Sequence, residues 1–356
     1  MLYRAGFSHV YQVAELPDHD DFRDAPDHER HRTVLLGSVA ALHIPGLVPV
    51  GEPRYVGDPW AKPVAKVSGL LQPIQQFLAK PLAGKIASAA RRFQRLFPKV
   101  PVPIRLSFGA WWLVRGSTLD ERLLSGHFET GEIRFVERYL RPGMIVLDIG
   151  AHHGLYTLLA SKNVGPEGKV IAFEPSVREC ERLRQHVRLN SCSNVRIEPI
   201  AIGAERSRGK LFVVDGAEDW CNSLRPPAVV GSGRSELVDV LPLDEYLSGA
   251  GITSADFLKL DVEGAELEVL RGARELLRKP ARPVILAEVY DIRTLPWGYP
   301  ASKIVGHLDK LGFKWFQLRA DGTLQSVASD RDVYDCNLVA IPSERMDRAT
   351  KTLAGK

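Results

Sequence analysis

Cysteine is scarce in this chain of 356 residues, and its four cysteines form no C-x-x-C pair and no metal-finger spacing. We therefore expect reduced thiols and no disulfide framework, as in a cytoplasmic protein. Long apolar runs are lacking as well. The most apolar stretch near the amino terminus, residues 34–50, contains His43, Pro45 and Pro49 and is too short to span a bilayer. No basic stretch with a long apolar segment follows Met1, so the sequence predicts neither a secretory signal nor a transmembrane segment.

The composition is otherwise ordinary for a folded soluble protein, with 45% hydrophobic and 25% charged residues. This mix excludes wholesale disorder and a collagen-like fibre, and the length suffices for one large domain or one domain with an appendage. The formal net charge of +4 is unevenly distributed. Residues 1–58 have a balance of −4, residues 59–119 carry ten basic side chains and no acidic one, and the remainder has a balance of −2. A nearly neutral body therefore follows one cationic segment.

Ten prolines between Pro45 and Pro103 predict an irregular N-terminal extension with short helices over residues 1–104. Within it, apolar residues recur at helical spacing over residues 81–97, among Lys and Arg side chains, which predicts a basic amphipathic helix. Through the basic segment 80–99 such a helix could contact an anionic membrane surface peripherally. We favour the simpler interpretation, a helix that packs across the main domain and keeps its cationic face in solvent.

From Arg105 onward short apolar strands alternate with helices, which predicts an α/β domain over residues 105–343 and a tail over residues 344–356. Such buried strands form a mostly parallel sheet with helices on both faces. A loop rich in Gly, Ser and Pro interrupts the pattern at about 215–235. The expected strands are 144–149, 169–174, 194–202, 210–214, 239–241, 257–260, 284–289, 313–318 and 336–341, and the expected helices are 154–163, 176–189, 265–277 and 303–311.

In an open sheet of this kind, ligands bind beyond the carboxyl ends of the strands, where the strand order reverses. The residues expected at these ends are unusually acidic: Asp148, Glu174, Asp261 with Glu263, and Glu288. Because desolvated carboxylates need partners, their accumulation at one edge predicts a polar or cationic ligand.

The first turn, DIGAHHG, has no side chains at Gly150 and Gly154, and the helix after it points its positive end there. Its spacing is G-x-x-x-G, not the G-x-G-x-x-G of pyrophosphate-binding sites. Glu174 closes the second strand 24 residues after Gly150, where an acid can accept hydrogen bonds from both hydroxyls of a ribose. A glycine turn and a ribose acid without the dinucleotide fingerprint predict S-adenosyl-L-methionine as the cofactor.

These residues resemble the FkbM-type S-adenosylmethionine-dependent methyltransferases. Four segments carry the resemblance: VLDIGAHHGLYTLLAS, GPEGKVIAFEPSVRECERLRQHVRLN, FLKLDVEGAELEVLRGARELL and RPVILAEVYD. They cover about residues 128–291, with a weaker tail to Ile341. The resemblance implies a class I methyltransferase, in which a Rossmann-like, mostly parallel sheet of seven strands has helices on both faces, preceded here by the N-terminal extension.

The resemblance also implies which residues bind the cofactor. Asp148, Gly150 and Gly154 would hold its methionine end, and Glu174 its ribose. The remaining expected contacts come from the glycine turn, from an acid before the first strand, from the end of the second helix and from the residue beside adenine: Ala151, His152, Glu129, Asn190 and Ala201. One departure stands out, because the family's turn usually reads Gly-Ala-Asn and this chain has two histidines there. His152 could replace the amide's hydrogen bond or add a titratable group, or the pair could be a tolerated, partly exposed turn.

Transfer of a methyl group to a hydroxyl requires in-line alignment and loss of the hydroxyl proton. Position at the sheet edge makes Asp261 and Glu263 the first candidates for the base, followed by Glu288 and the two histidines. Several carboxylates could instead chelate a divalent cation that acidifies the hydroxyl. Nothing in the sequence selects a metal, and we predict no metal ligands.

We predict O-methylation of a sugar, a glycan or another secondary metabolite, with the loop at 215–235 and residues 297–299 forming the acceptor pocket. Nucleic acid is not an expected partner, because the chain lacks an Asn-Pro-Pro-Tyr-like block and a Pro-Cys pair. Two alternatives stay open. A nucleotide-cofactor (NAD-type) oxidoreductase is disfavoured by the G-x-x-x-G turn. A non-catalytic binding protein on the same fold is disfavoured by the acids at the sheet edge.

Overall fold

The computed structural model describes residues 88–90, 92, 93, 96, 97, 100–214, 221–226 and 233–354. Most of the predicted extension, and most of the loop at 215–235, lie outside the described residues. Within the predicted basic helix, positions 88–90, 92, 93 and 96 are helical, Phe97 is not, and the others are not described. Among the described residues, no helix combines the length and the apolar character that a membrane span requires.

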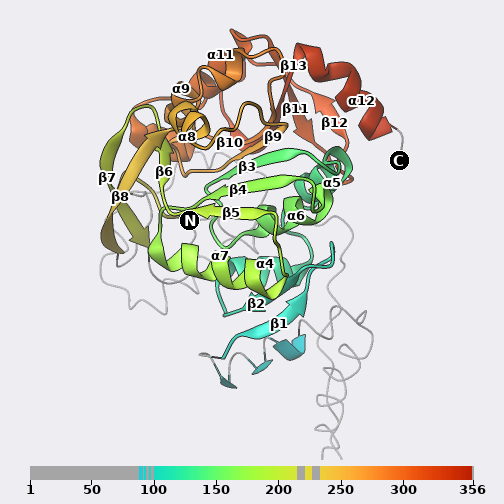
Figure 1. Ribbon diagram of the computed structural model, residues 1–356, viewed down its shortest axis with the longest axis vertical. Coiled ribbons are helices and arrows are strands. Elements are labelled where there is room, and N and C mark those ends of the chain that lie inside the picture. Colours follow the sequence, from blue (N-terminus) through green and yellow to red (C-terminus); the bar gives the residue numbers. More distant parts are fainter. Residues whose placement is uncertain are drawn as a thin grey trace, which may run out of the picture. The chain divides into compact units, whose positions relative to one another are not determined.

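The centre of the fold is an eight-stranded sheet in the order β12-β11-β13-β10-β9-β3-β4-β5 (Figure 1). Five neighbouring strands, β10, β9, β3, β4 and β5, run parallel, whereas β13 is antiparallel to both β10 and β11. The seven predicted strands of the sheet are all present, and the three-residue hairpin strand β12 adds an eighth. The bounds are β3 (Ile145–Ile149), β4 (Lys169–Phe173), β5 (Val195–Glu198), β9 (Phe257–Leu260), β10 (Val284–Tyr290), β11 (Phe313–Leu318), β12 (Leu324–Ser326) and β13 (Asp335–Pro342).

Helices cover both faces of this sheet, as the sequence predicts. Adjacent strand residues alternate between two apolar layers, so that Val146 packs beneath α5, α6 and α12 while Leu147 packs beneath α8, α9 and α11. Figure 1 shows the two groups of helices on different sides of the strands. The helices are α4 (Thr118–Ser125), α5 (Thr130–Tyr139), α6 (Leu155–Val164), α7 (Val177–Leu189), α8 (Leu243–Gly249), α9 (Glu266–Gly272), α10 (Asp291–Thr294), α11 (Ser302–Asp309) and α12 (Met346–Ala354), with short 3₁₀ turns η3 (Leu276–Arg278), η4 (Leu295–Trp297) and η5 (Ser343–Arg345).

The chain changes direction across the sheet beside β3. From β3 it proceeds outward through β4 and β5, and it then returns to place β9 and β10 on the other side of β3. The strand order therefore reverses between β3 and β9, and their carboxyl ends form the crevice in which open α/β sheets bind ligands.

A smaller sheet, β6-β8-β7, corrects one sequence prediction. The single strand expected over 194–202 is split at Pro199: β5 stays in the main sheet, whereas β6 (Ala201–Gly203) pairs with β8 (Gly233–Pro242). Proline has no N–H for a strand ladder, so the chain leaves the main sheet there. β7 (Ser207–Val214) completes the smaller sheet, which lies at the left of Figure 1.

Four elements before the main sheet were not predicted, and α5 is the last of them. β1 (Val102–Arg105) and β2 (Trp111–Val114) form a hairpin, and α4 follows it. Asp120 ties them together, because its carboxylate accepts hydrogen bonds from Trp112 Nε1 (2.7 Å) and from the Arg115 N–H (2.7 Å) while it takes part in the capping box of α4.

The turn after β3 leaves no space for a side chain at Gly150, which has a φ of 83°. An added Cβ would lie 1.7 Å from the carbonyl oxygen of Asp261. We expect Gly150→Ala to lower the free energy of unfolding by about 3 kcal/mol or more, because a steric overlap adds to left-handed backbone strain. Gly143→Ala is the matched control, since Gly143 has the same φ of 83° but no atom within 4 Å of its Cβ position. It should cost about 1–2 kcal/mol. Equal losses of unfolding free energy in the two variants, measured by urea unfolding, would contradict this steric account.

Candidate active site

Two turns meet at the crevice between β3 and β9, and both contain strained backbone. The N–H of Asp261, just after β9, donates to the carbonyl of Ile149 at the end of β3 (3.0 Å). Among the described residues, the non-glycine residues with positive φ are Glu129, His152, Ser191 and Glu263. Three of these four are predicted site residues. Such backbone persists only where the surrounding structure enforces it, and it concentrates at functional sites.

Three predicted catalytic carboxylates converge beside this crevice. Asp261 and Glu263 follow β9, Glu288 lies on β10, and one carboxylate oxygen of each lies within 4.8 Å of the others. Oε2 of Glu288 is buried without a hydrogen-bond partner among the described residues. Burial, and then repulsion by Asp261 and Glu263, raises the pKa of Glu288 well above its usual value. Burial also raises the pKa of Glu263 to about 8. This carboxylate cluster therefore holds at least one proton at neutral pH.

Two cations balance the carboxylate cluster. The side chain of Lys259 on β9 is only 1% exposed, and its Nζ lies 3.0 Å from Oδ2 of Asp261. Burial alone would lower the pKa of Lys259, but attraction by Asp261 and Glu129 outweighs it, and the pKa lies above its ordinary value. On the other side of the cluster, Nε of Arg293 lies 3.0 Å from Oε2 of Glu263. Within the described part of the chain, Glu288 is the carboxylate of the cluster that has no cation in hydrogen-bond contact.

Glu129 reaches the same region from the start of α5. Its Oε2 accepts a hydrogen bond from the hydroxyl of Tyr156 (2.6 Å), and its Oε1 accepts one from Nδ2 of Asn337 (3.1 Å). Nζ of Lys259 lies 5.1 Å from the centre of the Tyr156 ring. Burial raises the pKa of Glu129, and the neighbouring Lys259 opposes that shift. The acid before the first strand thus belongs to one network with the acids of the sheet edge.

Glu174 and Asp148 hold the ends of β4 and β3. The Glu174 side chain is almost fully buried; its Oε2 accepts from the N–H of His152 (2.7 Å) and its Oε1 from the N–H of Ser176 (2.9 Å). Burial nevertheless raises the pKa of Glu174 to about 8. Asp148 accepts a hydrogen bond from Oγ1 of Thr157 (2.5 Å), and burial raises its pKa to about 6. The structure therefore gathers Glu129, Asp148, Glu174 and the catalytic candidates around the two turns.

Comparison with known proteins identifies the domain. Residues 148–314 match the family model of the methyltransferase FkbM domain, which spans Asp148, Glu174, Asp261 and Glu288. The chain contains an FkbM methyltransferase domain. Its sheet order and its helices on both faces are those expected of class I methyltransferases.

Several curated methyltransferases are similar to this chain. It is 28% identical over 151 residues to the 2-O-methyltransferase NoeI of Sinorhizobium fredii. The aligned segment covers 39% of this chain and 61% of NoeI. It is 27% identical over 205 residues to the 31-O-demethyl-FK506 methyltransferase FkbM of Streptomyces tacrolimicus, covering 47% and 78%. The chain thus spans less than two thirds of NoeI, and likewise 57% of methyltransferase 1 of Beauveria bassiana. The crystal structure of methyltransferase FkbM from Methylobacillus flagellatus KT aligns with a TM-score of 0.36 and 16% identity, over 63% of this chain and 53% of that one.

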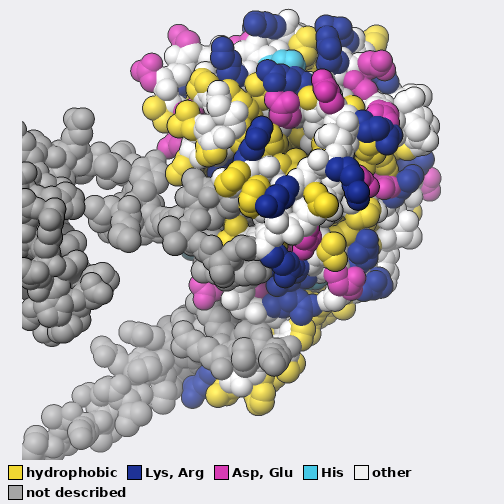
Figure 2. All heavy atoms as spheres, turned by 90° about the vertical axis from the view of Figure 1, so that its left-hand side faces the viewer, with side chains coloured by type: hydrophobic (Ala, Val, Ile, Leu, Met, Phe, Trp, Pro, Cys, Tyr) yellow, Lys and Arg dark blue, Asp and Glu magenta, His cyan; other side chains and the backbone are white. Residues whose placement is uncertain are grey.

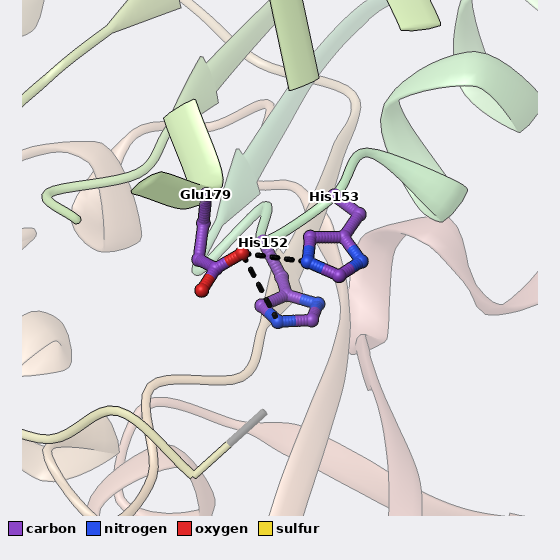
Figure 3. Close-up of side chains that lie close together, drawn as sticks. All are labelled: His152, His153 and Glu179. Carbon is purple, nitrogen blue, oxygen red and sulfur yellow. Dashed lines mark hydrogen bonds and ion pairs between the residues drawn. The ribbon is translucent and has the colours of Figure 1, made fainter. Parts of the chain in front are cut away.

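The two histidines that depart from the FkbM pattern bind α7. Their rings stack with centroids 3.7 Å apart, and Nε2 of His153 lies 2.6 Å from Oε2 of Glu179 (Figure 3). Nε2 of His152 lies 3.9 Å from the same oxygen. Hydrogen bonding by His153 and attraction by both imidazoles lower the pKa of Glu179 despite its burial, whereas burial lowers the pKa of His153. The pair fastens the FkbM glycine turn to α7 while the backbone of His152 binds Glu174.

Two predicted cofactor contacts lie apart from this group. Asn190 caps the far end of α7, where its side chain exchanges hydrogen bonds with the N–H (2.7 Å) and the carbonyl (2.8 Å) of Trp111. Because α7 runs back from the carboxyl end of β4, the structure does not bring Asn190 to the crevice. Ala201 is buried in β6 of the smaller sheet, three residues after Glu198 ends β5.

Sequence reasoning missed four residues that support the FkbM site: Lys259, Tyr156, Glu179 and Glu266. Glu266 is buried at the start of α9, and its Oε1 accepts from the N–H groups of Val262 (3.1 Å) and Gly264 (3.2 Å), which holds the turn that carries Glu263. A lysine inside the apolar strand FLKL was a usable signal, because an unpaired buried ammonium is costly and predicts acidic neighbours. Glu179 and Tyr156 gave no such signal.

The carboxylate cluster predicts a pH dependence of stability. The pKa of Glu263 is raised to about 8 from its usual value of 4.5, and that of Glu288 is raised as well. The folded protein therefore keeps protons that the unfolded chain releases. The stability that these groups contribute is complete below pH 4.5 and is lost as the pH rises towards about 8. The glutamine side chain of the variant Glu288→Gln cannot ionise. Between about pH 5 and 8, the free energy of unfolding in urea should therefore fall less for this variant than for the unaltered protein. Glu275→Gln, at an exposed position, should leave the slope of unfolding free energy against pH unchanged. A slope that Glu288→Gln does not alter would argue against a proton on this cluster.

Proposed function

We propose that this protein is an S-adenosyl-L-methionine-dependent methyltransferase that methylates a hydroxyl of a sugar, a glycan or another secondary metabolite. The observation that carries the proposal is the buried Glu174 facing the glycine turn at the strand reversal, inside an FkbM domain. Two relatives are named 2-O-methyltransferase NoeI and 31-O-demethyl-FK506 methyltransferase FkbM. Both names support oxygen as the atom that is methylated.

The residues of the crevice suit this cofactor chemically. Glu174 engages one backbone N–H with each carboxylate oxygen, which leaves further lone pairs for the two hydroxyls of a ribose. The acids at the edges of β9 and β10 provide negative charge for a ligand with an ammonium and a sulfonium group. Asp148 and the turn from Gly150 to Gly154 would hold the methionine end, with Ala151 and His152 contributing backbone, and Glu129 would border the cofactor pocket. Ala201 stays a proposed neighbour of adenine.

When bound, S-adenosyl-L-methionine supplies an electrophilic methyl group, and the protein must position the hydroxyl and remove its proton. We assign that proton to the carboxylate cluster. Asp261 has a side chain that is 33% exposed, against 10% for Glu263, and it is therefore the member that can reach an acceptor. Lys259 orients Asp261 through its 3.0 Å contact. The hydroxyl oxygen would form its new bond to the methyl carbon as the carbon–sulfur bond of the cofactor breaks, and the hydroxyl proton would go to Asp261.

The alternatives have weaker support. A nicotinamide-dependent oxidoreductase would lack the G-x-G-x-x-G turn on which pyrophosphate binding depends. A non-catalytic binding protein would have little use for a buried carboxylate cluster that costs folding stability at neutral pH. On the face drawn in Figure 2, basic and acidic side chains of the described residues are interspersed, which favours a small molecule over a nucleic-acid backbone as the partner.

Replacing the proposed ribose acid tests cofactor binding. Glu174→Ala should weaken the binding of S-adenosylhomocysteine at least about tenfold, because it removes the partner of both ribose hydroxyls and each hydrogen bond contributes on the order of 0.5–1.5 kcal/mol. Isothermal titration calorimetry measures this, with NAD⁺ titrated in parallel for the oxidoreductase alternative. Glu181→Ala, an exposed acid on α7, is the control and should bind like the unaltered protein. Unchanged affinity in Glu174→Ala would refute the ribose assignment, and binding of NAD⁺ alone would refute the proposed cofactor.

Replacing the proposed base tests the chemistry. Asp261→Asn should reduce methyl transfer by about a hundredfold or more under conditions where the variant stays folded, because general bases contribute 10²–10⁴ in rate. Binding of S-adenosylhomocysteine should change little, whereas the melting temperature should fall because the buried ammonium of Lys259 loses its ion-pair partner. Transfer of label from methyl-labelled cofactor to a panel of glycans and cell extracts measures turnover. Asp239→Asn, with an exposed side chain on β8, serves as the control. An Asp261→Asn variant with full turnover would exclude this residue as the base.

A further inference from the structure

A cavity of about 480 Å³ lies beside the carboxylate cluster, at a place that the sequence did not predict. It is formed by the segment from α4 to α5 together with β10, the end of β11 and the start of β13. The predicted acceptor residues 297–299 lie elsewhere. Tyr299 donates its hydroxyl to the carbonyl of Gly264, and Trp297 packs against the same glycine, so both support the turn after β9.

The floor of this cavity is continuous with the candidate active site. Glu129 lines the cavity and binds Asn337 with one oxygen, while its other oxygen binds Tyr156, the ring that Lys259 faces. Tyr290, also in the lining, is two residues beyond Glu288 on β10. A molecule in the cavity would therefore contact Glu129 directly, and Glu129 is connected to Asp261 through Tyr156 and Lys259.

The mouth of the cavity has the opposite charge. Arg122, at the end of α4, and Arg319, after β11, are both exposed lining residues. The side chain of Arg319 makes no hydrogen bond or ion pair within the part of the chain that the structure describes. A guanidinium offers five N–H donors in a fixed planar arrangement that suits carboxylate, phosphate and sulfate groups.

Between mouth and floor, the lining suits a hydroxylated ring. Phe128 and Tyr290 provide aromatic surface on which the C–H face of a sugar can pack, and Glu132 and Asn337 offer hydrogen-bond acceptors and donors. The volume falls within the range of small-molecule sites, about 300–1,000 Å³. A small number of polar groups around an aromatic surface would fix both the position and the orientation of such a ligand.

We propose that this cavity binds the methyl acceptor and that the acceptor is an acidic sugar, with its reacting hydroxyl at the Glu129 side and its anionic group at Arg319 and Arg122. The inference rests on the proposed function and adds the substrate class and its binding site. A neutral sugar would leave the arginines at the mouth without a partner from the ligand. A purely aliphatic acceptor would leave Glu132 and Asn337 facing apolar atoms, which costs binding energy.

The test is direct binding of simple sugars to the full chain, measured by calorimetry or ligand-observed NMR with and without S-adenosylhomocysteine. The probes are D-glucuronate, glucose 6-phosphate and glucose. We expect the two acidic sugars to bind at least about tenfold more tightly than glucose, with an affinity that falls as salt is added. Arg319→Gln should reduce glucuronate binding about tenfold and leave glucose binding unchanged, and Arg319→Lys should retain part of the preference.

Two further variants locate the site. Arg274→Gln removes an exposed arginine between α9 and η3 and should change no affinity. Phe128→Ala should weaken glucose and glucuronate alike, because both would pack on the ring. The inference is overturned if no sugar binds, if glucose binds as tightly as glucuronate, or if Arg319→Gln keeps the full preference for acidic sugars. If the unaltered protein does not bind S-adenosylhomocysteine, the proposed function is refuted instead. The sugar titrations without that ligand would still report on the cavity.

Discussion

The buried ammonium of Lys259 is the interaction on which the candidate site depends. Parallel strands bring their carboxyl ends to one edge, and in this chain those ends carry acids. In a medium of low dielectric constant such acids repel one another unless each charge is neutralised or hydrogen-bonded. Lys259 lies on β9 only two residues before Asp261, so one strand delivers both the cation and the anion. Its charge also acts on Glu129, which comes from α5 and lies outside the matched family segment. Where no cation reaches, the structure uses other means: backbone N–H groups hold Glu174, and protonation neutralises Glu288.

Sequence reasoning succeeded where local patterns decide the outcome. The strand Phe313–Leu318 has the predicted bounds, and β3, β4, β9 and β10 follow their apolar runs within one residue, because continuous buried strands have an unmistakable composition. The acids were found because they end those strands. It failed where distant segments decide. Pro199 sends β6 to a second sheet whose partner, β8, is more than thirty residues further on, and the β1–β2 hairpin depends on Asp120 and Asn190. No local pattern predicts that Tyr156 on α6 bridges Glu129 and Lys259.

The histidine pair illustrates the same limit within a recognisable motif. Read alone, two histidines after Gly-Ala suggest either a replacement for the usual asparagine or an indifferent turn. The structure shows a third arrangement, in which the side chains turn to Glu179 on α7 while the backbone N–H of His152 binds Glu174 (Figure 3). His152 adopts a φ of 49°, a left-handed conformation that is uncommon for residues other than glycine but in which asparagine and histidine are both enriched. Stacking with His153 and attraction to Glu179 offset that strain, so the substitution depends on a glutamate that is 27 residues away in sequence and adjacent in space.

The raised pKa values of Glu263 and Glu288 give the proposed reaction an order of events. A carboxylic acid that holds its proton cannot accept another, so Glu263 and Glu288 are poor bases in the free protein at neutral pH. A cationic ligand nearby favours the ionised form of each acid and lowers its pKa. Under the proposed function, binding of a sulfonium cofactor would therefore release a proton and convert the cluster into a base. Burial and mutual repulsion lower the stability of the free protein above pH 5, and the same two effects make proton acceptance conditional on the positive charge of the cofactor. The acids at this edge are thus better explained as a site poised for a cation than as anchors of the fold.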